Sequence, residues 1–363
     1  MNKVLILGGY GNFGKRIAKL FIRQKIHVII AGRSIIKAQE ALNELGELFC
    51  EVLILDVNNN FLEHLGNLIP KVVINTCGPF QNADYHQAKQ CIAFGVHYID
   101  LSDGREFVAG ISTLHESAKA SGVAVISGAS TVPGLSSAVV EYYLQKHFSK
   151  ITELKYGISP GQKSERGVAT TASIMSYVGK KLKPCGVGNE ERYGWQDLYV
   201  QKYPQIGNRL MCDCDVPDLD LFPKKYGIKN IRFSAGIENS FLHLGLWCIS
   251  WLIRLGLPIN LSKYTNLLLK ISNFFNFIGS NNGGMHIIVS GVDNVGKKIV
   301  KKWFIIALSD HGPYIPAVAS VVLAKKIINN ELNFTGAVPC LGLVTLEEYL
   351  RELEHLEIRT YEK

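Results

Sequence analysis

The chain has 363 residues, of which 47 % are hydrophobic and 19 % charged, and its formal net charge is +8. At about 100–200 residues per domain, this length predicts two domains with substantial cores. The high apolar fraction and the lack of Gly-, Pro- or Ser-rich tracts exclude a disordered chain, a collagen and a coiled coil. The eight cysteines have no CxxC pair or zinc-finger spacing, so we expect reduced thiols in a cytoplasmic protein and no metal site.

Short aliphatic runs alternate with helical patterns through the first 130 residues. The runs cover residues 3–8, 27–32, 51–56, 71–76, 96–101 and 123–127. Helical spacing of apolar residues follows the first two runs, at 12–24 and 34–45, with Ser34 as the expected N-cap of the second helix. Continuous aliphatic strands separated by helices are typical of a parallel sheet that is buried on both faces. We therefore expect an α/β fold with a doubly wound, Rossmann-type parallel sheet.

A glycine-rich turn separates the first strand from the first helix. Gly9, Gly11 and Gly14 fit the pattern G-x-G-x-x-G. In this pattern the glycines allow a tight turn and a close approach of the pyrophosphate, which then lies at the helix N-terminus. Because the motif stands at a strand–helix junction that opens a βαβ unit, it predicts a dinucleotide site.

The end of the second strand indicates which dinucleotide is bound. NAD-specific sites place a carboxylate there, whereas this chain has Gly32, Arg33 and Ser34. Arg33 is a planar cation that matches a 2′-phosphate, so NADP is predicted over NAD; the alternative for Arg33 is a solvated residue at the start of a helix. Asp56 and Val57 end the third strand and are expected beside the adenine, unless Asp56 caps the following turn.

Polar residues also follow the fourth and fifth strands. Cys77, Gly78 and Pro79 come after the fourth strand and are expected beside the nicotinamide, at the topological switch point of the sheet. The fifth strand supplies the acid–base candidates, which are His97, Tyr98 and Asp100. In the second half of the chain, Asp310 and His311 are further candidates for proton exchange.

These stretches together resemble the saccharopine dehydrogenase-like oxidoreductases. The similar segments are GGYGNFG, AGRS, LDV, INTCGPF, HYIDLSDGREF, GASTVPGLSSAVVEYYL, SDHGPYIPAVASVVLAKKI and TGAVPCLGLVTLEEYLREL. The resemblance implies an NADP-binding Rossmann domain at 1–130, an inserted α+β domain at 131–312 for substrate and dimer contacts, and a segment at 313–363 that returns to the first domain. It also implies hydride transfer on a small amino- or imino-acid-like substrate. The implied cofactor contacts are Gly9, Gly11, Asn12, Phe13, Gly14, Arg33, Ser34, Asp56, Val57, Cys77, Gly78 and Pro79.

Two other functions remain open. Tyr142 and Lys146 fit the Y-x-x-x-K pair of extended short-chain dehydrogenases and epimerases, in which an ammonium one helical turn away favours the phenol as a general acid or base. The second alternative is an NADP-binding regulatory or membrane-associated protein without turnover, because no catalytic base stands out.

The second half begins with a strand pattern at 152–159, a helix pattern at 168–179 and an expected antiparallel pair at 285–293 and 297–310. Residues 183–223 show no clear period, and part of this segment is expected to be a loop over the site. Residues 241–259 contain only His243 and Arg254 as acidic or basic side chains, and residues 266–279 are similarly hydrophobic. Arg254 argues against a spanning helix, so 241–259 is predicted to be a dimer-interface helix, with a peripheral membrane patch as the alternative.

The charge is concentrated in one part of the chain. Residues 221–310 carry 11 basic and 3 acidic side chains, whereas the nucleotide-binding part is nearly neutral. We therefore expect a small-molecule substrate and no nucleic-acid partner.

Overall fold

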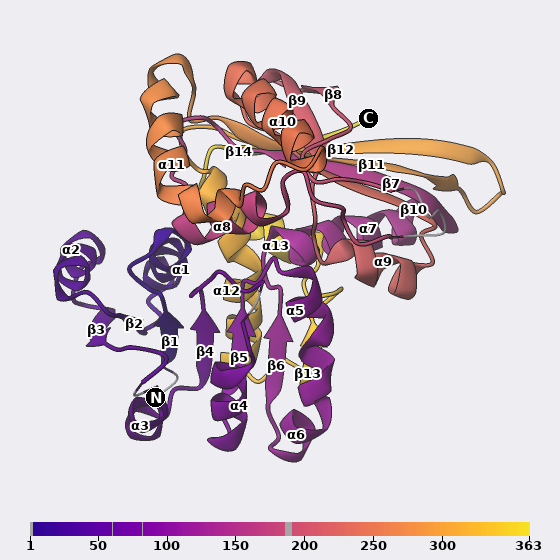
Figure 1. Cartoon of the computed structure of the whole chain (residues 1–363). Helices are drawn as coiled ribbons and strands as arrows, with labels where there is room; N and C mark the ends of the chain where they lie inside the picture. Colours follow the sequence, from indigo (N-terminus) through magenta and orange to yellow (C-terminus); the bar gives the residue numbers. More distant parts are fainter. Residues whose placement is uncertain (1–2, 60, 82, 186–190) are drawn as a thin grey trace. The chain divides into compact units, whose positions relative to one another are not determined.

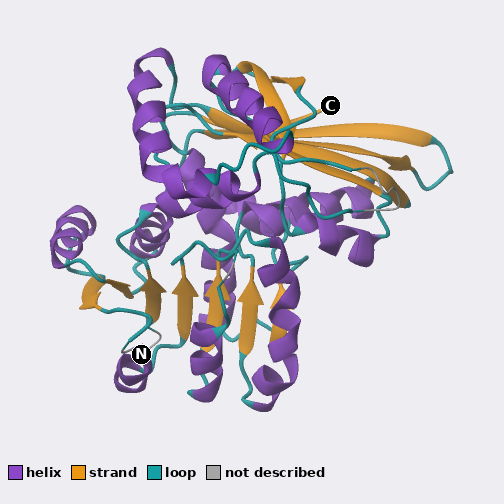
Figure 2. Ribbon diagram, in the orientation of Figure 1, coloured by secondary structure: helices purple, strands orange, loops and turns teal. Residues whose placement is uncertain are grey.

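The computed structural model describes residues 3–59, 61–81, 83–185 and 191–363 (Figure 1). The chain divides into two compact units. The first unit comprises Met1–Ala138 and Pro313–Leu353, and the second comprises Val139–Gly312 and Glu354–Lys363. Each unit has its own seven-stranded sheet (Figure 2).

The sheet of the first unit is parallel throughout. Its strands, in the order β13-β6-β5-β4-β1-β2-β3, are β1 (Val4–Leu7), β2 (Val28–Gly32), β3 (Cys50–Ile54), β4 (Val72–Asn75), β5 (His97–Asp100), β6 (Ala124–Ser127) and β13 (Gly336–Pro339). The strand order reverses at β1, which pairs with β2 on one side and β4 on the other. The central strands β1 and β4 are buried on both faces, as continuous aliphatic runs predict. The expected doubly wound α/β fold is confirmed.

Helices cover both faces of this sheet (Figures 1 and 2). They are α1 (Asn12–Arg23), α2 (Ile35–Leu45), α3 (Phe61–Leu68), α4 (His86–Ala93), α5 (Arg105–Gly110), α6 (His115–Ala120), α12 (Ile315–Ile328) and α13 (Leu346–Arg351). On one face, Phe61 of α3 and Cys91 of α4 share a core with Leu5 and Val73. On the other face α12 packs against α1, β4 and β5 and is buried along most of its length. Ser34 caps α2, as predicted, because its Oγ accepts a hydrogen bond from the Lys37 N–H.

The second unit has a mixed sheet. Its strands, in the order β14-β12-β11-β7-β10-β9-β8, are β7 (Lys150–Ser159), β8 (Tyr199–Tyr203), β9 (Gly207–Asp213), β10 (Asn230–Ala235), β11 (Gly283–Val292), β12 (Lys298–Ala307) and β14 (Ile358–Glu362). The expected antiparallel pair is present as β11 and β12. Its main helices are α7 (Ser136–Lys146), α8 (Val168–Tyr177), α9 (Asp218–Tyr226), α10 (Ser240–Arg254) and α11 (Thr265–Phe274).

Two expectations about segments differ from the structure. Residues 183–223 are more regular than predicted, since β8, β9 and the start of α9 lie there, while 186–190 lie outside the described residues. Residues 354–363 were expected to return to the first domain. They belong to the second unit instead, because β14 pairs antiparallel with β12.

The apolar stretch at 241–259 forms α10 and the loop that follows it. Its inner side, at His243, Leu246 and Ser250, is buried in the second unit. Within the described part of the chain, no helix has the length and apolar character needed to cross a bilayer.

Candidate functional site

The glycine-rich turn joins β1 to α1 at the carboxyl edge of the parallel sheet. Gly8 has φ +73°, and the Gly11 N–H donates to its carbonyl oxygen at 2.8 Å, which closes the turn. A Cβ on Gly14 would lie 2.5 Å from the Gly8 oxygen, and one on Gly9 would lie 2.6 Å from the Cβ of Ile30. Side chains are therefore excluded where β1, β2 and α1 meet.

The N-terminus of α1 opens directly from this turn. Its N-cap, Gly11, provides no side-chain cap, and the first helical turn, which begins with Asn12 and Phe13, contains no acidic residue. The positive end of the helix dipole is thus not neutralised by a carboxylate from its own first turn. A side-chain-free turn that leads into such a helix end fits a pyrophosphate.

The end of β2 lies against the same turn. The ring of Tyr10 packs so closely on Gly32 that a Cβ there would lie 2.6 Å from it, and the Tyr10 hydroxyl donates to the Leu53 carbonyl at 2.6 Å. Burial raises the pKa of Tyr10 to about 12, so this hydroxyl stays protonated. The adjacent Arg33 is exposed, and its guanidinium has no hydrogen bond or ion pair within the described residues. A planar cation is therefore available where a 2′-phosphate is expected.

Asp56 performs the capping role that was the alternative to an adenine contact. Its carboxylate accepts hydrogen bonds from the Asn58 N–H at 3.1 Å and the Asn59 side-chain amide at 2.9 Å. The following residue, Val57, packs against the hydrophobic core of the first unit. Both residues follow β3 at the carboxyl edge.

The loop after β4 is held by a buried amide. Asn75 donates from Nδ2 to the Tyr98 hydroxyl at 3.0 Å and accepts at Oδ1 from the Cys77 N–H at 2.9 Å. Burial raises the pKa of Cys77 to about 11, so the side chain is a neutral thiol and a poor nucleophile. Gly78 and Pro79 follow it, joined by a cis peptide bond.

The structure separates the three acid–base candidates of β5. His97 stands at the amino end of the strand, and its Nδ1 accepts a hydrogen bond from the Ala124 N–H at 3.0 Å. Tyr98 is buried in the core on the face that α3 and α4 cover, and burial raises its hydroxyl pKa well above the usual range. This placement corrects the expectation for both residues. His97 lies at the amino edge, away from the glycine turn and Arg33, and the Tyr98 hydroxyl is buried and hydrogen-bonded to Asn75.

Asp100, by contrast, ends β5 at that edge and is fully buried. Its Oδ1 accepts three hydrogen bonds, from the Ser102 N–H at 3.0 Å, the Ser127 hydroxyl at 2.8 Å and the Gly128 N–H at 3.0 Å. Its Oδ2 is buried without a hydrogen-bond partner in the described chain. Burial raises the pKa of Asp100 to about 6.

Sequence reasoning missed the two residues that tie Asp100 to the next strand. Ser127 ends β6 and Gly128 follows it with φ +79°. The only sequence signal was the dipeptide Ser-Gly after an aliphatic run, a pattern that any strand end can show. Tyr10 was missed for a related reason, because nothing in the glycine-rich motif indicates where the side chain of Tyr10 packs.

The candidates from the second half of the chain lie in the second unit and have local partners. The Lys146 ammonium stands over the Tyr142 ring, 4.4 Å from its centroid, which is a cation–π contact. His311 accepts a hydrogen bond at Nδ1 from the Glu357 N–H at 2.9 Å.

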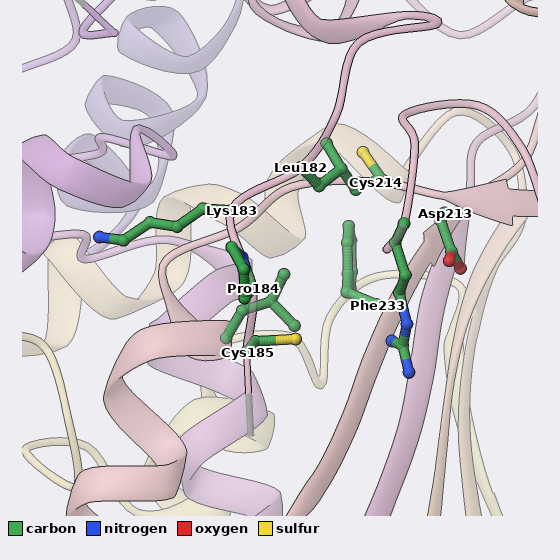
Figure 3. Close-up of a pocket in the computed structure, with 9 residues that line it drawn as sticks. Leu182, Lys183, Pro184, Cys185, Asp213, Cys214 and Phe233 are labelled. Atoms are coloured by element: carbon green, nitrogen blue, oxygen red, sulfur yellow. The ribbon is translucent and has the colours of Figure 1, made fainter. Parts of the chain in front are cut away.

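A small pocket also lies in the second unit, beside β9 and β10 (Figure 3). Cys185, Cys214 and Phe233 line it, and the Lys183 side chain extends away from them. Its cavity of about 20 Å³ has room for about one water molecule. The pocket is too small for an amino-acid substrate.

Comparison with known proteins identifies the fold and the nucleotide-binding part. Residues 4–126 match the family model of the saccharopine dehydrogenase NADP binding domain. Over these residues the chain is similar to that domain. The solved structure of apo saccharopine dehydrogenase (L-Glu forming) from Saccharomyces cerevisiae matches with a TM-score of 0.69 and 11 % identity over 100 % of both chains, which shows a shared fold.

Amine dehydrogenase from Mycobacterium smegmatis matches with a TM-score of 0.48 and 11 % identity, over 93 % of this chain and 94 % of that one. No curated protein matches the sequence. The domain match over residues 4–126 and the fold shared with the yeast enzyme confirm the resemblance deduced from the motifs. The saccharopine dehydrogenase NADP binding domain contains the glycine turn, Arg33 and Asp100, and its match ends within β6, just before Ser127.

Proposed function

We propose that the protein is an NADP-dependent oxidoreductase that transfers hydride between NADP(H) and a small amino- or imino-acid-like substrate. The observation that carries the cofactor assignment is the exposed Arg33 guanidinium, which has no partner among the described residues and follows β2 beside the glycine turn. Arginine binds phosphate through parallel N–H donors, and no carboxylate stands at this position to repel a 2′-phosphate.

The remaining residues proposed to contact the cofactor lie along the carboxyl edge of the parallel sheet. Gly9, Gly11, Asn12, Phe13 and Gly14 would hold the pyrophosphate at the start of α1, and Arg33 with Ser34 would hold the 2′-phosphate. Val57 would flank the adenine beside the turn that Asp56 caps, and the segment Cys77–Pro79 would flank the nicotinamide. When bound, the cofactor supplies the hydride, while the protein supplies binding, orientation and control of protons.

Asp100 is best assigned a positioning role. Its side chain is fully buried, so it cannot touch a substrate in this conformation. Its Oδ1 joins the loop after β5 to the loop after β6 through Ser102, Ser127 and Gly128. We infer that it orders the part of the edge where the nicotinamide is expected.

The substrate class rests on the relative. The matched yeast enzyme is a saccharopine dehydrogenase whose name specifies L-Glu formation. An amino- or imino-acid-like substrate for this chain is the corresponding proposal. It is tested by following NADPH oxidation with a panel of 2-oxo acids and amines; NADPH binding without turnover on any of them would favour the regulatory alternative.

The NADP assignment predicts a selective effect of Arg33→Ala. Because the guanidinium would contact only the 2′-phosphate, we expect NADPH affinity to fall about tenfold or more, as for a lost charge-assisted hydrogen bond, while NADH affinity stays within about twofold. The measurement is titration of cofactor fluorescence. Arg23→Ala, an exposed arginine at the far end of α1, is the matched control and should change neither affinity. Equal loss of NADPH and NADH in Arg33→Ala would contradict the assignment.

A further inference from the structure

The outer side of α10 is an exposed apolar stripe. Phe241, Leu244, Cys248, Leu252 and Leu255 recur at intervals of three or four residues, which places them along one side of a helix. All are exposed; Phe241 retains 74 % and Leu255, which follows the last turn, 80 % of the accessible surface. A single exposed hydrophobic residue needs no explanation, but a stripe along a whole helix does.

A second stripe continues the first. In α11 and the short helix η4 (Phe275–Ile278) that follows it, Leu267, Phe274 and Phe277 are exposed, the two phenylalanines by 73 % and 71 %. The rings of Phe241 and Phe275 lie 6.0 Å apart, so the stripes meet at one end. We call this surface the apolar face and define it by Phe241, Leu252, Leu255, Leu267, Phe274 and Phe277.

Satisfied polar contacts hold the helices beneath this face. The Glu238 carboxylate, just before α10, accepts hydrogen bonds from the Gln162 N–H at 2.7 Å and the Ser280 hydroxyl at 2.7 Å, and it pairs with Arg209 at 3.0 Å. The Gln162 side chain in turn donates to the carbonyl of Ser272 in α11 at 2.8 Å. These contacts hold α10 and α11 in place beneath the apolar face. The exposure of the face therefore does not result from poor packing below it.

The charges near the face in the sequence are mostly basic, and the single carboxylate among them is already engaged. Residues 233–292 contain four charged side chains, and Glu238 is the acidic one. Arg254 is engaged, since it donates to the Gln196 side chain at 2.6 Å and lies 3.9 Å from the Tyr193 ring centroid. Lys263 and Lys270 are exposed, and neither ammonium has a hydrogen bond or ion pair with a described residue. The apolar face thus has two available cations and no available carboxylate nearby in sequence.

We propose that the apolar face docks the protein on a membrane surface that carries anionic headgroups. Apolar and aromatic side chains on one helix face, with lysines at its border, suit the boundary between acyl chains and headgroups. A second copy of the chain would bring the same two lysines with no carboxylate to pair them, whereas anionic lipid supplies the complementary charge. The proposal is independent of the NADP assignment and would place the enzyme's second unit at a lipid surface.

Flotation of the full-length protein with vesicles tests the apolar part of the proposal. We expect binding to vesicles of phosphatidylcholine with about 30 % phosphatidylglycerol, where surface potential adds to insertion. The double variant Phe274→Ser/Phe277→Ser should weaken this binding about tenfold or more, since it removes two inserted rings. The control Val200→Ser/Val295→Ser changes two exposed apolar residues elsewhere in the second unit and should bind like the wild type.

The lysines are tested separately. Lys263→Gln/Lys270→Gln should weaken binding to the anionic vesicles about fivefold for each charge removed and leave binding to phosphatidylcholine alone unchanged. The control Lys297→Gln/Lys298→Gln removes the same charge where the β11–β12 turn meets the start of β12, and it should have little effect.

Three results would overturn the proposal. The first is no flotation with either vesicle, and the second is wild-type flotation of Phe274→Ser/Phe277→Ser. The third is a dimer in light scattering that this variant splits into monomers, because the apolar face would then be occupied by a second copy. Circular dichroism verifies that each variant is folded. We expect folded variants because the substituted side chains are exposed.

Discussion

At the residue level, Asp100 combines complete burial with an unequal set of hydrogen bonds. Three donors converge on Oδ1, and none among the described residues reaches Oδ2. Burial outweighs these donors and raises the pKa from 3.8 to about 6. A carboxyl group whose pKa is higher in the folded state favours folding while it is protonated. Its contribution is therefore complete below about pH 3.8 and is lost as the pH rises through about 6.

This linkage predicts that Asp100→Asn changes the pH dependence of stability. Asparagine keeps an acceptor at Oδ1 and avoids the buried charge, so the variant should gain stability relative to wild type as the pH rises. Between pH ~4.5 and ~7.5 the difference in unfolding free energy should shift by about 2 kcal/mol in favour of the variant. Denaturant titration followed by circular dichroism measures it. Glu47→Gln, at an exposed position of the same unit, should give a pH-independent difference; a similar result for Asp100→Asn would refute the buried-charge explanation.

At the level of elements, the strands of the first unit could be predicted because strands that are buried on both faces consist mainly of aliphatic residues. A strand covered on both faces, such as β1 or β4, is aliphatic at every position or nearly so, and here each such run is short and bounded by turn residues or a helical pattern. The turn glycines could also be identified from the sequence. They are required because β1, β2 and α1 approach so closely that no side chain fits between them.

The position of β14 and the separation of the polar residues of β5 could not be predicted from the sequence. The strand β14, with the sequence IRTYE, is an edge strand with partly exposed side chains, and only its pairing with β12 shows which unit it joins. His97 and Asp100 lie three residues apart in one strand, yet one ends at each edge of the sheet. The polar residues of β5 are close together in the sequence, but they do not all lie at the same site. The role of Asp100 depends on how deeply its carboxylate is buried and on which groups donate hydrogen bonds to it. Both are determined by segments that are distant in the chain, such as the end of β6.

The β1–α1 turn makes a prediction at this same level. In Gly14→Ala the new Cβ would lie 2.5 Å from the Gly8 carbonyl oxygen, a backbone atom that cannot move without opening the turn. We expect NADPH affinity to fall about tenfold or more and NADH affinity to fall equally, because the pyrophosphate cradle is common to both. Cofactor fluorescence measures both affinities. Gly245→Ala, in open space on α10, is the control. Unchanged affinity in Gly14→Ala would mean that the cofactor does not use this turn.

For the whole molecule, the division into two units has a spectroscopic consequence. The four tryptophans, Trp195, Trp247, Trp251 and Trp303, all belong to the second unit. Trp195 and Trp303 are buried, so tryptophan fluorescence reports the folding of the second unit. Fluorescence of bound NADPH would report the first unit, and the two cores can be followed separately in one sample.

This separation makes the role of β14 testable. Deleting residues 358–363 removes the antiparallel pairing from Trp303–Glu362 to Ala307–Ile358 and the packing of Tyr361 against the cluster that includes Phe304. The edge of β12 then loses its partner strand, so we expect the tryptophan-detected transition to move to lower denaturant. NADPH affinity should stay within about twofold, because the parallel sheet and the glycine turn lie in the other unit. A parallel loss of NADPH binding would show instead that the two units fold as one cooperative block.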